Sequence, residues 1–211
     1  NGVAVFTSSL KGAVDLRIVV RQLPGERATI NGQLLIYYSS WTDYMGFEII
    51  HPIYGPDWQA GRDSGMWIVT SDNCRYIQLV VHDCPGGNGV GFWSPALNSG
   101  MFECLIYDNG RKGSNLDHGI YTQNDTGLKI FQDCFIFNNW AIGLCLYSSG
   151  GYTNNYLIQH NVLWNNGRDG SQDDALVGGA NVSRGLQFLN NYVYRKRLFG
   201  GTVRCGYSGD H

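Results

Sequence analysis

Two stretches of the chain, QDCFIFNN at 132–139 and QHNVLWNN at 159–166, decide the fold. Each has a short apolar run that ends in two asparagines, and the same frame returns along the chain. The other members are MGFEIIHP (45–52), IQLVVHDC (77–84), FECLIYDN (102–109) and LNNYVYRK (189–196). The six segments align on Phe47, Leu79, Cys104, Cys134, Asn161 and Asn191. These anchors lie 32, 25, 30, 27 and 30 residues apart, and a period of this length indicates a repeat architecture.

One column of this alignment is aliphatic in every repeat. It lies two positions after the anchor and reads Ile49, Val81, Ile106, Ile136, Leu163 and Val193. Because side chains alternate along a strand, we expect this column and the anchor column to face a common interior. The column before the anchor is mostly polar and is expected to face solvent. It reads Gly46, Gln78, Glu103, Asp133, His160 and Asn190.

An earlier apolar run, such as GIYTQN at 119–124, precedes each segment, so a unit is predicted to contain a strand, a turn, a strand and a loop. Helical periodicity is missing, and so is the LxxLxLxxN frame of leucine-rich repeats. Stacked units can bury apolar faces that a single unit cannot. We therefore predict an all-β fold, a single-stranded right-handed parallel β-helix of about seven coils, roughly 30–35 Å long at the rung spacing of a sheet.

Identical residues in adjacent coils stack at that rung spacing. The sequence predicts asparagine ladders in three columns, which pair Asn161 with Asn191, Asn138 with Asn165, and Asn139 with Asn166. Among the six cysteines, Cys104 and Cys134 share the anchor column, where they form either a disulfide or two stacked thiols. Cys74 and Cys84 bracket one coil and would clip its loop in an oxidising compartment.

The stretch 117–167 resembles the pectate-lyase-like right-handed β-helix repeats of many bacterial proteins. The segment LRIVVRQLPGERATING (16–32) resembles the opening coils of such proteins, so the resemblance covers most of the chain from about residue 12. It implies the fold and leaves the activity open, because this superfamily includes lyases, hydrolases, epimerases, adhesins and phage spikes. Together with the abundance of Tyr, Asn and Gly, it implies a secreted or cell-surface protein.

Composition limits the partners. With 15 Lys and Arg against 17 Asp and Glu, the net charge of −2 gives no electrostatic reason to expect a nucleic-acid or anionic-membrane partner. The longest apolar runs, such as LLIYY at 34–38, are too short to span a bilayer. We expect residues 1–211 to form one domain of a longer chain, since VRCGYSGDH (203–211) lacks a polar cap; further domains or self-association would cover that end.

The densest group of chemically active side chains lies between residues 82 and 124. Enzymes that this sequence resembles bind a polysaccharide in a groove outside the stacked sheets, and elimination needs a cation, a base and an acid there. Asp83 and Asp108 share a column in adjacent coils, where two carboxylates repel unless a cation lies between them. Calcium is the natural candidate, and the alternative is that both residues only cap turns, like Asn138 and Asn165.

Four residues are candidates for catalysis, and they are His118, Tyr121, Arg111 and Lys112. Arg111 and Lys112 lie in a loop and supply positive charge for a uronate carboxylate. His118 has the parity of the interior residue Ile120, so it is either a structural histidine or, if Gly119 bends the chain, a base. Tyr121 has the opposite parity and is expected to face out.

The candidates for substrate binding are His82, Tyr107, Asn124 and Trp164. Three of them belong to a column that reads Ile50, His82, Tyr107, Phe137, Trp164 and Tyr194. If this aromatic column faces out, sugar rings or another protein can pack on it, and if a loop covers it, it is core. Asp173 and Asp174 are interpreted as a solvated turn, and Arg195, Lys196 and Arg197 as a solvated strand end or a patch for an acidic polymer.

The leading hypothesis is an extracellular carbohydrate-active β-helix protein that binds or cleaves an acidic polysaccharide, with elimination favoured over hydrolysis if it is an enzyme. The alternative is a non-catalytic structural or adhesive solenoid, such as a surface fibre or spike segment. A third reading is a carbohydrate-binding module within a larger protein.

Overall fold

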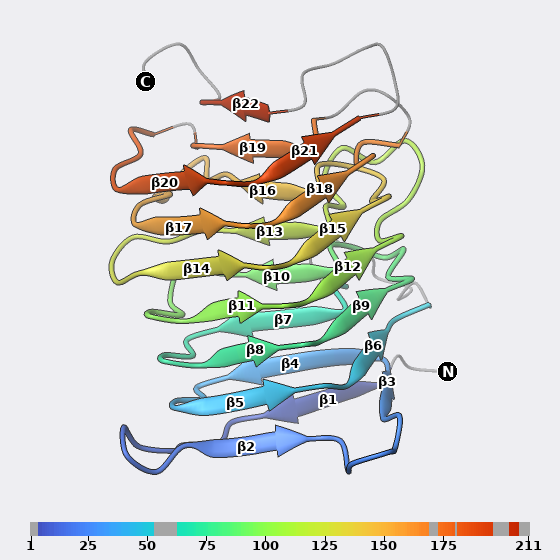
Figure 1. The fold of residues 1–211 in the computed structure, drawn as a ribbon, viewed down its shortest axis with the longest axis vertical. Coiled ribbons are helices and arrows are strands. Elements are labelled where there is room, and N and C mark those ends of the chain that lie inside the picture. The colour runs from blue at the N-terminus through green and yellow to red at the C-terminus, as the bar shows by residue number, and fades with distance from the viewer. Residues whose placement is uncertain (1–3, 53–62, 169–172, 180, 196–202, 207–211) are drawn as a thin grey trace.

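The computed structural model describes residues 4–52, 63–168, 173–179, 181–195 and 203–206. Its strands form three parallel sheets that wind into one right-handed solenoid, and no helix is present in the described residues (Figure 1). The prediction of an all-β, right-handed parallel β-helix is confirmed. The sheets hold eight, seven and seven strands in the described residues, close to the predicted number of coils.

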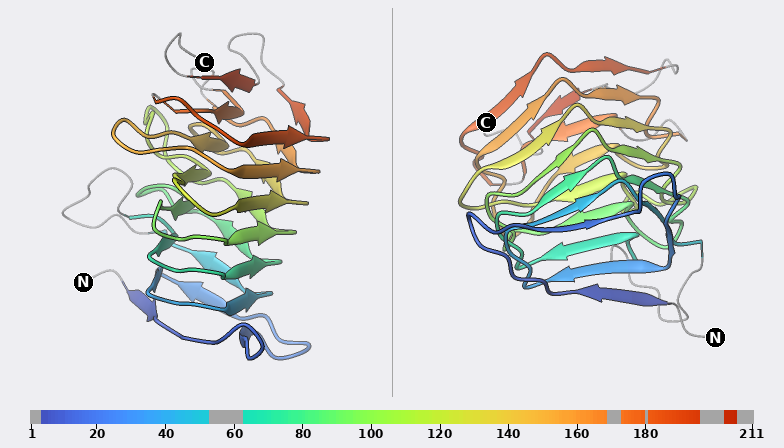
Figure 2. Two further views of the ribbon diagram at one scale, coloured as in Figure 1. Left: turned by 90° about the vertical axis from the view of Figure 1, so that its left-hand side faces the viewer. Right: turned by 60° about the horizontal axis from the view of Figure 1, so that its bottom comes forward.

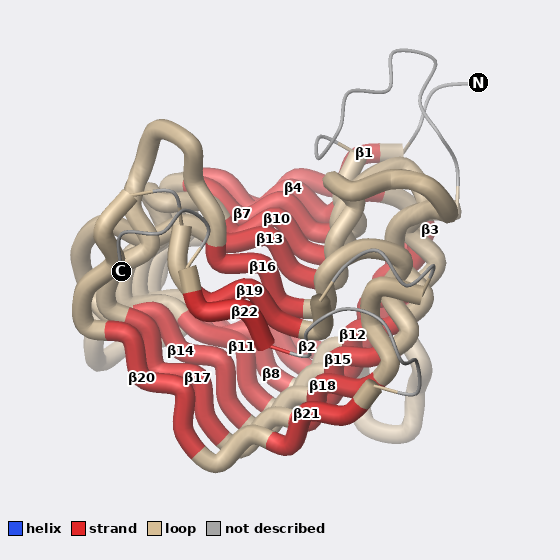
Figure 3. The backbone as a smooth tube through the Cα atoms, turned by 90° about the horizontal axis from the view of Figure 1, so that it is seen from above, coloured by secondary structure: helices blue, strands red, loops and turns tan. Residues whose placement is uncertain are grey.

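The first sheet contains β1 (Val5–Ser8), β4 (Gln33–Tyr37), β7 (Met66–Val69), β10 (Val90–Phe92), β13 (Ile120–Thr122), β16 (Leu144–Leu146), β19 (Ala175–Val177) and β22 (Val203–Cys205). The second contains β2 (Ile18–Arg21), β5 (Thr42–Met45), β8 (Arg75–Ile77), β11 (Gly100–Phe102), β14 (Lys129–Gln132), β17 (Tyr156–Gln159) and β20 (Leu186–Leu189). The third contains β3 (Thr29–Asn31), β6 (Glu48–Ile50), β9 (Val80–His82), β12 (Leu105–Tyr107), β15 (Phe135–Phe137), β18 (Val162–Trp164) and β21 (Tyr192–Tyr194). Figure 2 shows the coils stacked along one axis, and Figure 3 shows the three sheets around it.

Each coil has three strands, whereas the sequence predicted two. The quoted segments run from the end of a second-sheet strand, around a corner, through a third-sheet strand. The residue before each anchor makes this corner in the left-handed region, with φ between 51° and 57° at Gln78, Glu103, Asp133, His160 and Asn190. A single left-handed residue bends the chain sharply, so one apparent strand is divided between two sheets.

The predicted interior columns are confirmed. Ile49, Val81, Ile106, Ile136 and Leu163 are fully buried, and the last four pair in register across the third sheet. The anchors Cys104 and Cys134 are buried as well, and both are free thiols, so the alternative of two stacked thiols is the observed one. Cys74 and Cys84 are also free.

All three asparagine ladders are present. Asn161 Nδ2 donates to Asn191 Oδ1 at 2.9 Å, Asn165 Nδ2 to Asn138 Oδ1 at 2.8 Å, and Asn139 Nδ2 to Asn166 Oδ1 at 2.9 Å. The last ladder is longer than predicted. It begins one coil earlier, with Asn109 Nδ2 donating to Asn139 Oδ1 at 3.1 Å, and ends on Asp174.

The interpretation of Asp173 and Asp174 as a solvated turn is wrong. Both are buried, because the chain brings them under the last asparagine rung rather than out to solvent. Asp174 Oδ1 accepts hydrogen bonds from the backbone N–H of Asn166 at 2.7 Å and from its side-chain amide, and Asp173 pairs with Arg204 at 2.7 Å. Burial raises the pKa of Asp174 to about 6.

We expect Asp174→Asn to raise the free energy of unfolding at pH 8 by about 1–2 kcal/mol and to leave it nearly unchanged at pH 4. Asparagine keeps the acceptor for Asn166 without a buried charge. Because the folded pKa is raised, the neutral acid is favourable below the unfolded pKa of about 3.9, and this contribution is lost as pH rises through about 6. Urea unfolding of the wild type and of Asp174→Asn at the two pH values measures the difference in free energy of unfolding. An equal difference at both pH values would contradict the prediction.

Of the predicted basic strand end, Arg195 is buried and donates to the Gly167 carbonyl at 3.1 Å, while Lys196 and Arg197 lie outside the described residues. Within the described part of the chain, no helix is long and apolar enough to cross a membrane.

Candidate functional site

The aromatic column of the third sheet faces out, as one of the two alternatives predicted. Its rings form ladders along the solenoid axis. The His82 and Tyr107 centroids are 4.7 Å apart and nearly parallel, Tyr107 and Phe137 are 4.8 Å apart, and Trp164 stacks on Tyr194 at 4.4 Å. Because each ring covers the face of its neighbour, the column presents ring edges to solvent. A sugar that stacks on an aromatic face therefore finds little free face here.

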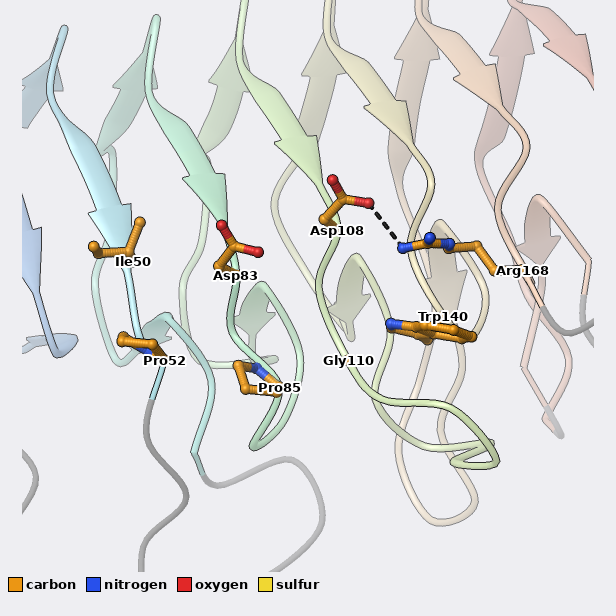
Figure 4. A pocket seen from close by; sticks show the side chains of 8 residues that line it. All are labelled: Ile50, Pro52, Asp83, Pro85, Asp108, Gly110, Trp140 and Arg168. Atoms are coloured by element: carbon orange, nitrogen blue, oxygen red, sulfur yellow. Dashed lines mark hydrogen bonds and ion pairs between the residues drawn. The ribbon is translucent and has the colours of Figure 1, made fainter.

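An open cleft of about 570 Å³ lies where the third-sheet strands end and the chain turns toward the first sheet. It is lined by Ile50, Pro52, Asp83, Pro85, Asp108, Gly110, Trp140 and Arg168 (Figure 4). Asp83 and Asp108 occupy the corner positions directly after β9 and β12, with φ of 51° and 52°. Asn138 and Asn165 make the same corner in the next coils. Aspartate and asparagine tolerate this conformation, so the local backbone explains why these residue types recur.

Arg168 is held in the cleft from two sides. Its Nη1 lies 3.0 Å from Asp108 Oδ1, and its guanidinium carbon lies 4.4 Å from the centre of the Trp140 ring. In Figure 4 the guanidinium group lies flat over the indole. Partial burial, together with the Asp83 carboxylate, raises the pKa of Asp108, and Arg168 opposes that shift. The arrangement fixes one cation beside two carboxylates on a surface open to solvent.

His82 connects this cleft to a second group of charges. Its Nδ1 lies 2.8 Å from Asp83 Oδ2, and its Nε2 lies 3.0 Å from Glu48 Oε1. Glu48 also accepts from the hydroxyl of Thr29 at 2.6 Å and from Arg27. The Thr29, Arg27 and His82 hydrogen bonds lower the pKa of Glu48 to about 2. His82 thus orients Asp83, with both of its nitrogens engaged.

The two carboxylates that the sequence suggested for calcium are brought together, but the protein supplies few other ligands. Calcium takes six to eight oxygen ligands. Asp108 already pairs with Arg168, and no group of three or more His, Cys, Asp or Glu able to hold a metal occurs among the described residues. A calcium ion at Asp83 and Asp108 would therefore take most of its ligands from water or from a bound polymer.

The catalytic candidates lie elsewhere. His118 and Tyr121 belong to the first sheet and the turn before it, with their rings 5.9 Å apart. His118 is buried, but its ring stacks beside that of Tyr121 on one side of the first sheet, whereas strand alternation predicted the two on opposite sides. Burial lowers the pKa of His118 to about 3. Tyr121 is half-buried beside Trp93, and its hydroxyl accepts from Gln123 at 3.0 Å.

The loop before β13 carries the two predicted cations. Arg111 Nε lies 3.2 Å from the buried Asp117 carboxylate, and Lys112 is exposed in a turn. Asn124 is buried at a corner, where its amide donates to the carbonyls of Gly127 and Asn154. The structure thus gathers Asp83, Asp108, His82 and Tyr107 at one edge of the third sheet, with Trp164 two coils farther along. It does not bring His118 and Tyr121 onto that sheet.

Sequence reasoning missed Trp140, Arg168 and Glu48. The first two follow the double asparagines Asn138–Asn139 and Asn165–Asn166, within NNW and NNGR. Since those asparagines mark a corner in successive coils, the residues just after them had to lie on one ridge. The position of Trp140 and Arg168 directly after repeated asparagine pairs was therefore the sequence signal that could have identified them.

The three parallel sheets wound into one right-handed solenoid define the fold of this chain as a parallel β-helix. No protein family and no curated protein matches the chain. Among solved structures, ORF18 of Geobacillus virus E2 is similar over 96% of this chain, with a TM-score of 0.49 and 14% identity. Pectate lyase Pel9A is similar over 90%, with a TM-score of 0.47 and 15% identity. The chain spans 41% and 51% of the lengths of these two proteins, and the likeness concerns the fold alone.

Proposed function

We propose that this chain binds an acidic polysaccharide outside the cell, at the cleft lined by Asp83, Asp108, Trp140 and Arg168. The observation that carries the proposal is the fixed guanidinium of Arg168. Its position between the indole of Trp140 and the carboxylate of Asp108 is set before a ligand arrives, which reduces the ordering cost of binding. About a third of the side chain remains exposed, so N–H donors remain for a uronate carboxylate.

The carboxylates of the cleft suit the rest of a sugar. Asp83 is largely exposed, and His82 holds it from behind. Its free oxygen can accept from sugar hydroxyl groups. An acidic polymer would also meet repulsion from Asp83, and a calcium ion shared between Asp83, Asp108 and the polymer would remove it. We therefore propose that calcium strengthens binding.

Binding without cleavage is the simpler form of this proposal. The groups suggested for elimination, His118, Tyr121, Arg111 and Lys112, are not gathered at the cleft, and His118 is buried. If the chain also cleaves its polymer, elimination is the chemistry we expect, with Arg168 acidifying the C5 proton by neutralising the uronate carboxylate.

Titration calorimetry with pectate, alginate and a glycosaminoglycan, each with calcium or with EDTA, tests the proposal. We expect binding of at least one polymer and an at least tenfold loss of affinity in Arg168→Gln, about the value of one charge-assisted hydrogen bond. Arg184→Gln is the matched control, because it removes the same charge from an exposed residue in the loop before β20. Circular dichroism verifies that both variants fold.

No binding to any polymer would refute the proposal. Equal losses in Arg168→Gln and Arg184→Gln would show only general electrostatic attraction. Ultraviolet absorbance of an unsaturated product, followed on the same samples, separates elimination from binding. An increase in absorbance that disappears in Tyr121→Phe would move the chemistry to the first sheet.

A further inference from the structure

The outer surface of the third sheet is apolar across four coils. The outward positions of β12, β15, β18 and β21 form two columns of four residues that pair in register. We call them the outer apolar face; they are Leu105, Tyr107, Phe135, Phe137, Val162, Trp164, Tyr192 and Tyr194. None of the eight is charged. Figures 1 and 3 show these strands side by side, along one side of the solenoid.

Five of these side chains are large and substantially exposed. Leu105, Phe135, Trp164 and Tyr194 expose 37–40% of their surface and Tyr192 exposes 56%. Soluble monomers seldom expose a contiguous apolar patch of several hundred Å², and a larger one marks an interaction site. The position of this face on a regular sheet makes it flat, and a flat apolar surface fits another flat apolar surface.

A polysaccharide does not fit this face well. Sugars stack on the faces of aromatic rings, and here the rings cover one another, with Tyr107 on Phe137 and Trp164 on Tyr194. The eight residues also offer the carboxylates of an acidic polymer no cation, only the neutral donors of tyrosine and tryptophan. The acidic and basic side chains within the strands of this sheet, Glu48 and His82, lie on the two preceding coils.

We infer that the outer apolar face pairs with the same face of a second copy of this chain, about a two-fold axis that lies in the plane of the interface, parallel to the sheet and perpendicular to the solenoid axis. Such an axis makes the interface self-complementary and runs the two solenoids antiparallel. An aromatic side chain contributes ~150–250 Å² when fully buried, so the exposed parts of these residues sum to roughly 500–600 Å² a copy. The total of roughly 1,000–1,200 Å² is at the lower end of specific interfaces, which predicts a reversible dimer.

Sedimentation velocity without any polysaccharide tests this inference. Over about 1–100 µM protein we expect the weight-average mass to rise toward twice that of one chain. Salt at about 1 M should not reverse the rise, because the interface is apolar and screening weakens only charges. Phe135→Glu and Leu105→Lys each place a charge within the face and should keep the protein monomeric over the same range.

Leu128→Glu is the matched control, since it adds a charge at an equally exposed leucine in the loop before β14. It should leave the dimer unchanged, and thermal unfolding checks that all three variants fold. A wild-type protein that stays monomeric at 100 µM, or a dimer that survives both face variants, would overturn the inference. Loss of polysaccharide binding in Phe135→Glu with no change of mass would overturn it too, and would assign the face to sugar. Arg168→Gln should still dimerise, so the two proposals fail separately.

Discussion

Replacing Asn139 by leucine should lower the free energy of unfolding by about 3 kcal/mol or more, because several buried hydrogen bonds depend on this one side chain. Its Oδ1 accepts from the backbone N–H of Asn109 and from the Asn109 side-chain amide, each at 3.1 Å. Its Nδ2 donates to the Ile106 carbonyl at 3.1 Å and to Asn166 Oδ1 at 2.9 Å. Leucine has a similar volume and can replace none of these bonds. A buried polar group left without a partner costs about 1–3 kcal/mol.

The surroundings of Asn139 leave no room for repacking. A Cβ atom placed on Gly119 would lie 2.7 Å from Asn139 Nδ2, so this amide packs against bare backbone. The branched end of leucine would meet that backbone. The adjacent residue provides the control. Asn138→Gly keeps the left-handed conformation of the corner and removes a single half-exposed bond to Asn165, so we expect a loss of less than about 1 kcal/mol. Urea unfolding followed by circular dichroism measures both, and similar losses would contradict the ladder as a main source of stability.

Lys129→Met should lower the free energy of unfolding by about 2 kcal/mol or more. Lys129 is fully buried inside the solenoid, where its ammonium group donates to the carbonyls of Gln123 at 2.8 Å, Trp93 at 2.9 Å and Phe92 at 3.3 Å. It also lies 4.0 Å from the centre of the Phe92 ring. Two effects oppose each other. Removing a buried charge relieves its desolvation, whereas three carbonyl dipoles lose their shared donor. We expect the second effect to prevail, because three acceptors and a ring face satisfy all the hydrogen-bonding capacity of an ammonium group.

The pH dependence of stability gives an independent test of Lys129. Burial lowers its pKa well below the ordinary value. Between the lowered folded pKa and the unfolded pKa of about 10.4, the unfolded chain binds more protons, so this residue makes stability rise with pH. Lys129→Met should remove that rise. Lys112→Met, in an exposed turn, is the control and should leave the free energy of unfolding unchanged. A stabilised Lys129→Met protein would show that desolvation of the ammonium prevails.

The fold could be predicted from the sequence because equivalent residues of a solenoid have the same surroundings in successive coils. Ile106, Ile136 and Leu163 meet the same interior in successive coils, so their alignment alone revealed the column. The asparagine pairs were predictable for the same reason, since an amide can bond to an identical amide one rung away. Features that occur once were not predictable. Lys129 stands where neighbouring coils have Ser99 and Tyr156, and nothing in its segment signals three inward carbonyls. The burial of Asp174 depends on its meeting the end of a ladder, which a local reading of DD as a turn does not capture.

The candidate site was half predictable. Asp83, Asp108, His82 and Tyr107 come from strand ends, whose positions follow the repeat, and the structure does gather them. Trp140 and Arg168 come from loops of different length, and the contact between Arg168 and Asp108 spans 60 residues. Strand alternation predicted Tyr121 on the outer side and His118 on the inner side, whereas the stacked rings of the two residues lie on one side of the first sheet. Alternation also gave no information about which of the three sheets either residue joined, because the sequence had been read as two strands a coil.

The left-handed corners have a consequence for how such a rod changes length in evolution. Asp133 and His160 occupy the same corner of consecutive coils with nearly equal φ, and the strands that follow them pair in register. Excision or duplication of the segment between two such corners joins backbone of matching conformation, so the chain can lose or gain one whole rung without a distorted junction. A gain or loss of a single residue inside a strand would instead turn the following side chains of that strand to the opposite face of the sheet. This geometry therefore favours the gain or loss of complete coils, while the loops between the strands vary freely in length.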